Sequence, residues 1–235
     1  MNDHPHALPQ GYELYEYRIR GVLGHGAMGI TYRAWDTNLD KEVAIKEYLP
    51  GDLAERIEGA DVGPRSSSDR DAYLRGLDGF LKEAQTLALF RHPSIVTVHR
   101  FFEANGTGYM VMEYEKGESL SALLRRRKEP FTEDALKRIL LPLLDGLAVV
   151  HGAAFIHGDI KPANVRIRED GTPVLLDFGS VRTGFGDSNA RGPGAVTPGY
   201  APIEQYYADG NVGPWTDIYA LAAIMYEAVS GRPPP

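Results

Sequence analysis

The chain has 235 residues, of which 43% are hydrophobic and 24% charged, as expected of a globular protein with a substantial core. Its formal net charge of −7 and pI near 5.5 argue against bulk nucleic-acid binding, which needs a basic surface. Because there are no cysteines, disulfides and thiolate chemistry are excluded, which fits a reducing cytosol. Residues 1–11 lack the apolar run of a secretory signal, and the longest apolar stretch, 139–156, is interrupted by Pro142, Asp145 and His151, so we expect a cytoplasmic chain with no membrane segment of its own, a membrane anchor in a longer parent protein being left open.

The first 115 residues predict a β-rich region. Alternating apolar and polar residues predict strands at 15–23, 30–35 and 43–46, and two more at 96–102 and 109–114 joined by a turn at Asn105-Gly106. Apolar residues recur at helical spacing from 80 to 91, where His92-Pro93 ends the helix. The polar residues 1–11 predict a disordered tail, and the polar, serine-containing residues 50–71 predict an inserted, mobile loop.

Beyond residue 118 the pattern becomes helical. Thr132 is a good N-cap, and Glu133 and Asp134 place negative charge in the first turn of a long apolar helix that runs to about His151. A second apolar helix is expected at 216–229. A small β-rich lobe followed by a mostly helical lobe predicts an α+β fold of two lobes, divided near residue 115.

Three glycines, Gly24, Gly26 and Gly29, lie between the first two predicted strands. Without side chains, such a turn lets backbone N–H groups close over phosphates, and its place between two strands distinguishes it from a Rossmann fingerprint. Glycine-rich turns are common in ordinary hairpins, and the three glycines alone would favour that simpler interpretation. Lys46 on the third strand, a cation able to contact nucleotide phosphates, shifts the balance toward a phosphate-binding loop.

A second group of residues carries the chemistry of phosphoryl transfer. The sequence His157-Gly158-Asp159-Ile160-Lys161-Pro162-Ala163-Asn164 is followed by Asp177-Phe178-Gly179. Together they supply a carboxylate to accept a hydroxyl proton, a cation near the γ-phosphate, and two oxygen ligands for Mg²⁺. A surface turn rich in Asp and Asn is the simpler alternative, and the combined spacing makes it the weaker one.

Taken in order, the glycine loop, Val43-Ala44-Ile45-Lys46, these two loops and Ala201-Pro202-Ile203-Glu204 closely resemble the motifs of bacterial serine/threonine protein kinases of the eukaryotic-like (Hanks) type. The resemblance covers residues 12–235 and includes an insert, at about 50–71, found in a subset of these kinases. It implies a two-lobe kinase fold, with an N-lobe at 12–115 and a mostly helical C-lobe at 116–235 that is incomplete after the 216–229 helix.

The resemblance also implies a role for each matching residue. Asp159 would be the catalytic base, Lys161 would neutralise charge on the γ-phosphate, and Thr197 would lie beside both. Asn164 and Asp177 would hold Mg²⁺, with Mn²⁺ an alternative, and Lys46 would contact the ATP phosphates. The further nucleotide-site residues would be Leu23, Gly24, Gly26, Gly29, Ala44, Glu83 (the ion-pair partner of Lys46), Met112, Glu113 and Glu115. The implied partners are protein substrates with Ser or Thr acceptors, and the oligomeric state is left open.

Some positions depart from the family pattern. Gly158 replaces the usual Arg before Asp159, and Thr31 replaces a Val, which is also β-branched. Arg166 stands where an apolar side chain usually lies under the adenine. Its aliphatic stem could serve there if the guanidinium reaches solvent.

Two other functions are compatible with parts of the sequence. Small-molecule phosphotransferases of the aminoglycoside and choline kinase type also carry His-Gly-Asp followed by Asn and share much of the architecture. Lys161, the complete Asp177-Phe178-Gly179 and the segment 197–204 favour the protein kinase. The other alternative is a catalytically silent nucleotide-binding scaffold, against which the intact set of catalytic residues argues.

Overall fold

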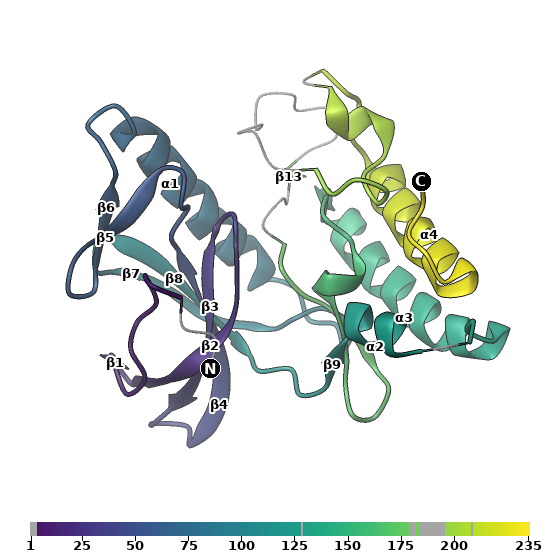
Figure 1. Ribbon diagram of the computed structural model, residues 1–235, viewed down its shortest axis with the longest axis horizontal. Helices are drawn as coiled ribbons and strands as arrows, with labels where there is room; N and C mark the ends of the chain where they lie inside the picture. The colour runs from purple at the N-terminus through teal and green to yellow at the C-terminus, as the bar shows by residue number, and fades with distance from the viewer. Residues whose placement is uncertain (1–3, 128, 179–181, 184–195, 208) are drawn as a thin grey trace. The chain divides into compact units, whose positions relative to one another are not determined.

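The computed structural model describes residues 4–127, 129–178, 182–183, 196–207 and 209–235 (Figure 1). The chain divides into two compact units. The first comprises Met1–Leu89 and Thr97–Tyr114, and the second comprises Phe90–Val96 and Glu115–Pro235. The second boundary lies one residue from the division expected at residue 115.

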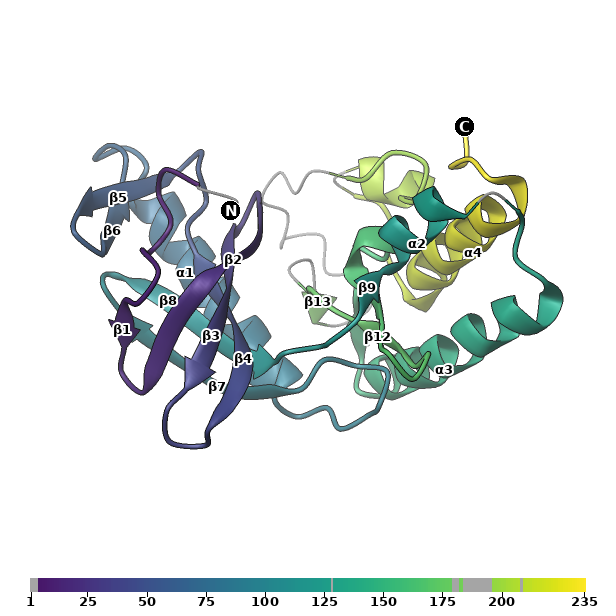
Figure 2. The same ribbon diagram turned by 60° about the horizontal axis from the view of Figure 1, so that its bottom comes forward.

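A six-stranded antiparallel sheet forms the first unit, in the order β1-β2-β3-β4-β8-β7 (Figures 1 and 2). Its strands are β1 (Glu13–Leu14), β2 (Tyr17–Gly26), β3 (Gly29–Asp36), β4 (Lys41–Tyr48), β7 (Val98–Ala104) and β8 (Thr107–Glu113). All five strands expected in this region are present. The predicted turn between β7 and β8 is also found, because Asn105 and Gly106 both adopt positive φ, 50° and 69°, as a tight hairpin turn requires.

One helix, α1 (Arg70–Leu87), packs on the sheet of the first unit (Figure 2). It buries Tyr73, Leu77, Phe80, Ala84 and Leu87, a spacing that places all five on one face. The helix begins about ten residues before the position expected from its apolar pattern. Its early turns contain charged residues and two glycines, and their apolar residues include the exposed Leu74 beside the buried Tyr73 and Leu77, so periodicity alone revealed only the second half.

The two segments expected to lack structure are ordered in this unit. The predicted mobile loop contains a hairpin of β5 (Ala54–Glu58) and β6 (Asp61–Pro64), turned at Gly59 with φ 56°. The predicted disordered tail also departs from expectation, since residues 4–11 include Leu8, which is only 3% exposed. Both errors have one cause: the partners of these polar segments lie elsewhere in the chain.

Helices dominate the second unit. They are α2 (Leu120–Arg126), α3 (Glu133–Gly152) and α4 (Pro214–Ser230), with short 3₁₀ turns η1 (Pro162–Asn164) and η3 (Ile203–Tyr206). Short strands accompany them: β9 (Glu118–Ser119), β11 (Val165–Ile167) and β12 (Pro173–Leu175) form one sheet, and β10 (Phe155–Ile156) pairs with β13 (Arg182–Thr183). Thr132 caps α3 as predicted, because its hydroxyl accepts the Ala135 N–H at 3.3 Å.

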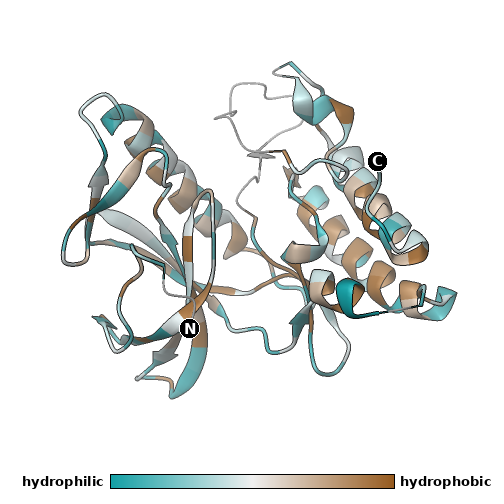
Figure 3. Ribbon diagram, in the orientation of Figure 1, coloured by the Kyte–Doolittle hydropathy of each residue, from teal (hydrophilic) through white to brown (hydrophobic). Residues whose placement is uncertain are grey.

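The core of the second unit lies between α3 and α4, both strongly hydrophobic along much of their length (Figure 3). Leu143 and Leu147 of α3 and Leu221 and Ile224 of α4 are each at most 1% exposed. Among the described residues, no helix is long and apolar enough to cross a membrane.

Candidate active site

Lys46 lies on β4 of the first unit and is 7% exposed. It pairs with Thr31 of β3 and Met110 of β8, so a strand on each side holds its backbone. Its ammonium nitrogen lies 6.0 Å from the ring centre of Phe80 on α1. Glu83 is on the same helix, three residues further on. The ion pair between Lys46 and Glu83 stays a prediction.

The glycine loop is the hairpin between β2 and β3, closed by the pair Gly26–Gly29. Gly29 has φ 145°, and a Cβ there would lie 1.9 Å from the Glu47 carbonyl oxygen, so the sheet itself excludes any other residue. A Cβ on Gly24 or Gly26 would meet nothing within 4 Å. The fold therefore does not demand glycine at these two positions, and the space beside them is open to a ligand.

The residues expected to border an adenine lie on neighbouring strands. Ala44 of β4 and Met112 of β8 are cross-strand partners, each 8% exposed, and Leu23 of β2 is 36% exposed. Glu113, at the end of β8, accepts from Lys41 at 2.9 Å and contacts the His99 ring at 2.7 Å. Burial acts to raise the pKa of Glu113, but the hydrogen bonds from Lys41 and His99 outweigh it and lower the pKa below its ordinary value.

Glu115, also expected at the nucleotide site, belongs to the second unit. Its carboxylate accepts two hydrogen bonds from the Arg168 guanidinium, at 2.6 and 2.8 Å, and the residue is 7% exposed. Arg168 also donates to the Pro93 carbonyl at 3.0 Å. The side chain of Glu115 thus has a structural role, in a bidentate pair that joins residues distant in sequence.

In the second unit the catalytic-loop residues form one hydrogen-bonded cluster. Asp159 accepts from the Thr197 hydroxyl at 3.0 Å and from the Asn164 amide at 3.1 Å, and it forms an ion pair with Lys161 at 2.7 Å. The Lys161 ammonium also donates to the Thr197 hydroxyl at 3.2 Å. The structure therefore brings together four residues that the sequence spreads over 39 positions, from 159 to 197.

A buried carboxylate on α4 organises the backbone of this loop. Asp217 is 1% exposed and accepts the N–H groups of His157 at 2.9 Å and Gly158 at 2.8 Å, while its Oδ2 lies 2.7 Å from the His151 ring. Gly158 has φ 77°, a conformation that glycine adopts without strain. The sequence pattern did not reveal Asp217; the available signal was its position near the start of the apolar 216–229 segment, which has only one other acidic residue, Glu227.

The loop expected to hold Mg²⁺ is anchored to the catalytic loop. The Leu176 N–H donates to the Asn164 carbonyl at 2.8 Å, and Phe178, fully buried, packs against the His157 ring in a tilted arrangement with centroids 4.3 Å apart. Asp177 between them is exposed and has φ 50°. Gly179 lies outside the described residues.

The donor set fits a magnesium ion held mainly by its substrate. The side-chain nitrogen of Asn164 donates to Asp159, so the side-chain oxygen of Asn164 stays available as a hard ligand. The Asp177 carboxylate, from the second motif, would be the other protein ligand. The described residues contain no group of three or more His, Cys, Asp or Glu side chains that could hold a metal. Magnesium usually takes one or two protein oxygens and completes its shell with phosphates and water.

Comparisons with known proteins identify the family. The protein kinase domain family matches residues 17–235, so the chain belongs to the protein kinase family. A curated relative, the serine/threonine-protein kinase PknL of Mycobacterium tuberculosis, is 31% identical over 220 residues, which cover 93% of this chain and 50% of PknL. The probable serine/threonine-protein kinase SCO3848 of Streptomyces coelicolor is 33% identical over 226 residues, covering 93% of this chain and 30% of the relative.

A solved structure supports the same assignment. The apo form of PpkA-294 superposes with a TM-score of 0.85 at 40% identity, covering 98% of this chain and 81% of that one. The predicted family and the α+β two-lobe kinase fold are therefore confirmed. The chain spans half or less of the length of the curated relatives it matches.

Proposed function

We propose that this chain is a protein kinase domain that transfers the γ-phosphate of ATP–Mg²⁺ to Ser or Thr hydroxyls of protein substrates. The observation that carries the proposal is the cluster in which Asp159 contacts Lys161, Asn164 and Thr197 at once. Because phosphoryl transfer needs positioning and charge stabilisation more than covalent help, a preformed cluster of this kind is suited to it.

Asp159 is the group in this cluster that can accept the proton of the acceptor hydroxyl. It is partly exposed, with 22% of its side chain accessible, so a substrate can reach it. Its partners Asn164 and Thr197 fix the carboxylate orientation, which places the basic oxygen before the substrate arrives. Lys161, 28% exposed, adds a positive charge beside the transferring phosphoryl group.

Nucleotide binding is assigned to both units. In the first, Lys46 would pair with the phosphates and with Glu83, while the open space at Gly24 and Gly26 lets backbone N–H groups approach them. In the second, Asn164 and Asp177 would hold Mg²⁺, which when bound neutralises phosphate charge. Because ATP is supplied in the cytosol, we place this domain on the cytoplasmic side.

The cluster also favours a protein Ser/Thr substrate over the alternatives. Lys161 and Thr197 bond to one another and to Asp159, and Lys161 and the segment 197–204 are among the features that separate the sequence from aminoglycoside and choline kinases. A silent scaffold would not need to preserve three separate contacts to the base. The serine/threonine-protein kinase names of the relatives point in the same direction.

The first prediction tests this function. Asp159→Ala should abolish transfer of radiolabelled phosphate from ATP to a generic protein acceptor and leave ATP binding largely intact, because the base acts on the acceptor rather than on the nucleotide. Asp78→Ala is the matched control and should transfer normally, because Asp78 lies on the exposed face of α1 in an ion pair with Lys82 at 2.7 Å. Near-normal transfer by Asp159→Ala would refute the assignment of the base.

A further inference from the structure

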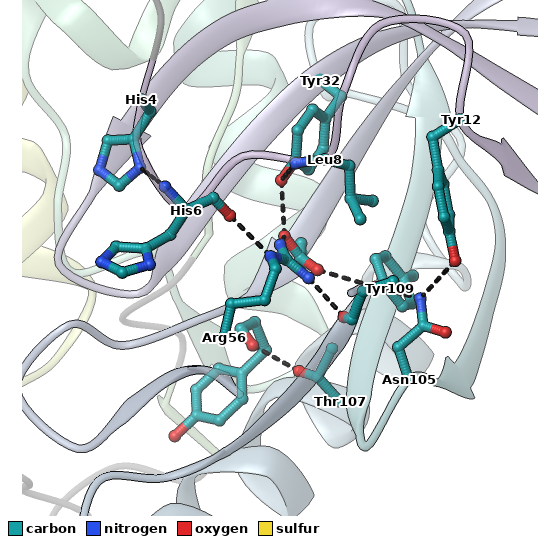
Figure 4. Close-up of polar contacts among 12 residues, drawn as sticks. His4, His6, Leu8, Tyr12, Tyr32, Arg56, Asn105, Thr107 and Tyr109 are labelled. Carbon is teal, nitrogen blue, oxygen red and sulfur yellow. Dashed lines mark hydrogen bonds and ion pairs between the residues drawn. The ribbon is translucent and has the colours of Figure 1, made fainter. Parts of the chain in front are cut away.

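The residue next to Lys46 carries a buried carboxylate that the proposed reaction does not use. Glu47 is 0% exposed and accepts three hydrogen bonds: from the Tyr32 hydroxyl at 2.6 Å, the Tyr109 hydroxyl at 2.7 Å, and the Arg56 guanidinium at 2.8 Å (Figure 4). The Arg56 side chain is itself only 10% exposed. This is a complete donor set around a charge that burial would otherwise penalise.

Glu47 and Lys46 occupy opposite faces of the same strand. Successive side chains alternate along a strand, and Lys46 shares its face with Tyr48, whose ring lies 5.6 Å from Phe80 of α1. The Glu47 face carries Tyr109, its direct cross-strand partner. Because the two residues share a peptide bond, whatever fixes the carboxylate on one face also fixes the backbone that presents the lysine on the other.

The carboxylate also connects the sheet to two segments that lie outside it. The Leu8 N–H donates to the Tyr32 hydroxyl at 3.0 Å, and the Arg56 guanidinium donates to the carbonyls of His6, at 2.9 Å, and Ala60 (Figure 4). Arg56 belongs to β5, so one guanidinium joins the β5–β6 hairpin, the N-terminal segment and Glu47. Residues 6–8 and the hairpin therefore brace β4 from its Glu47 face.

The three groups that donate to Glu47 all stay protonated. Burial and the neighbouring Glu47 charge raise the pKa of both Tyr32 and Tyr109, so each phenol stays protonated and able to donate. Burial opposes the charge on Arg56, but the Glu47 carboxylate outweighs it and raises the pKa of Arg56. Removing any one donor would leave a buried carboxylate oxygen short of a partner, which is costly.

We propose that Glu47 is a positioning residue for the kinase reaction. Its carboxylate, held by Arg56 and by the docked residues 6–8, fixes β4 so that Lys46 is presented to the nucleotide phosphates. The inference rests on the proposed function, because it assumes that Lys46 binds those phosphates.

The test separates phosphate binding from binding of the nucleoside. Calorimetric affinities for ATP–Mg²⁺ and for adenosine are measured on the whole chain and on Glu47→Gln and Leu8→Asp. We expect ATP to bind roughly five-fold more weakly in each variant, with adenosine unchanged, because only ATP depends on Lys46. Leu8→Asp should undock the N-terminal segment while the Glu47 side chain itself stays unchanged, so it tests the brace even if Glu47→Gln does not fold.

Glu42→Gln is the matched control. Glu42 is also on β4, is also paired with an arginine, Arg33, at 2.6 Å, and carries the same substitution, but 18% of its side chain is accessible, whereas Glu47 is fully buried. It should leave both affinities unchanged. If Glu42→Gln weakens ATP as much as Glu47→Gln does, the effect belongs to the strand in general and the proposal is wrong.

A double-mutant cycle distinguishes failure of this inference from failure of the proposed function. Lys46→Met alone should weaken ATP without affecting adenosine, and Glu47→Gln should have no further effect in that background. If Lys46→Met leaves the ratio of ATP to adenosine affinity unchanged, the proposed role of Lys46 is wrong. If Lys46→Met lowers ATP affinity but Glu47→Gln and Leu8→Asp do not, or if the two effects simply add, the positioning role of Glu47 is wrong.

Discussion

Arg166 is the residue at which this chain departs most from the family pattern. It lies on β11, paired with Ser119 on one side and Val174 on the other. One Nη of its guanidinium donates to the Gly117 carbonyl at 3.2 Å in an exposed contact, while its Nε is buried with no hydrogen-bond partner among the described residues. An unpaired buried N–H is unfavourable, so this arginine is held at a cost.

The second prediction concerns this position. Arg166→Leu should tighten ATP binding by about 1 kcal/mol, because a leucine would extend the apolar surface offered to an adenine and would remove the buried unpaired N–H. Isothermal titration with ATP checks it, and Arg125→Leu, at an exposed position of α2, serves as the control. An unchanged affinity would show that Arg166 does not lie under the base, and a weaker affinity would show that the arginine itself contributes to ATP binding; either result contradicts the prediction.

Glu113 illustrates how an exposed ion pair responds to pH. Since hydrogen bonds from Lys41 and His99 lower its pKa in the folded state, protonation is easier in the unfolded chain. The stability that these contacts contribute is therefore fully present above the carboxyl's unfolded pKa, about 4.3, and is lost as the pH falls through the lower folded pKa.

The third prediction follows from that sign. Glu113→Gln should flatten the acid limb of the stability profile between about pH 5 and pH 3. The difference from the parent should be a fraction of a kcal/mol, because 39% of the Glu113 side chain is accessible and solvent screens the pair. Urea unfolding across this range measures it. A steeper acid limb in the variant would mean that the folded state raises, rather than lowers, the pKa of Glu113.

At the scale of elements, the glycine loop combines a structural requirement with open space. Gly29 cannot carry a side chain, because its Cβ position is taken by the backbone of β4 at Glu47 and by Leu49 just beyond it. Gly26, its hairpin partner, has no such neighbour. The same motif therefore contains one glycine that the sheet needs and others whose absent side chains leave room for a ligand.

The fourth prediction uses this contrast. Gly29→Ala should destabilise the protein by roughly 2 kcal/mol or more, since either β4 or the hairpin must shift and φ is unfavourable for alanine. Gly26→Ala should have the same unfolding temperature as the parent protein but should bind ATP more weakly, because the added methyl group enters the space left for phosphates. Thermal unfolding and ATP titration of both variants provide the comparison. Equal losses of stability in the two variants would show that the sheet requires glycine at Gly26 as much as at Gly29, which contradicts the prediction.

At the scale of the whole molecule, the residues proposed to bind nucleotide are divided between the two compact units. The first carries Lys46 and the glycine loop, and the second carries the catalytic cluster and the loop of Asp177. Nucleotide that binds these residues in the folded chain and not in the unfolded chain raises the unfolding temperature of the protein by mass action.

The fifth prediction concerns this linkage. ATP–Mg²⁺ at about 100 times its dissociation constant should add about 2.7 kcal/mol of stability and raise the unfolding temperature by roughly 5–10 °C. Removing Mg²⁺ with a chelator should reduce the shift, and Asp177→Ala should lose this Mg²⁺ dependence. Adenosine, which lacks phosphates, is the control and should be insensitive to Mg²⁺. A shift in Asp177→Ala that depends on Mg²⁺ as strongly as the parent would reject Asp177 as a ligand.

The sequence alone determined those features whose physical cause is local. The turn at Asn105-Gly106, the cap at Thr132 and the positions of the five strands follow from the preferences of neighbouring residues. The catalytic loop was recognisable for the same reason, because Asp159, Lys161 and Asn164 lie within six positions of one another.

Only the tertiary structure decided which distant residues complete these local features. The Glu47 carboxylate meets Tyr109, 62 residues away, and Asp217 meets the His157 backbone, 60 residues away. A buried charge is stable only where enough donors converge, and that convergence depends on how the chain is folded. Likewise, the segment around Leu8 and the β5–β6 hairpin, which show no helical or strand periodicity in the sequence, are ordered parts of the first unit because their partners lie elsewhere in the chain.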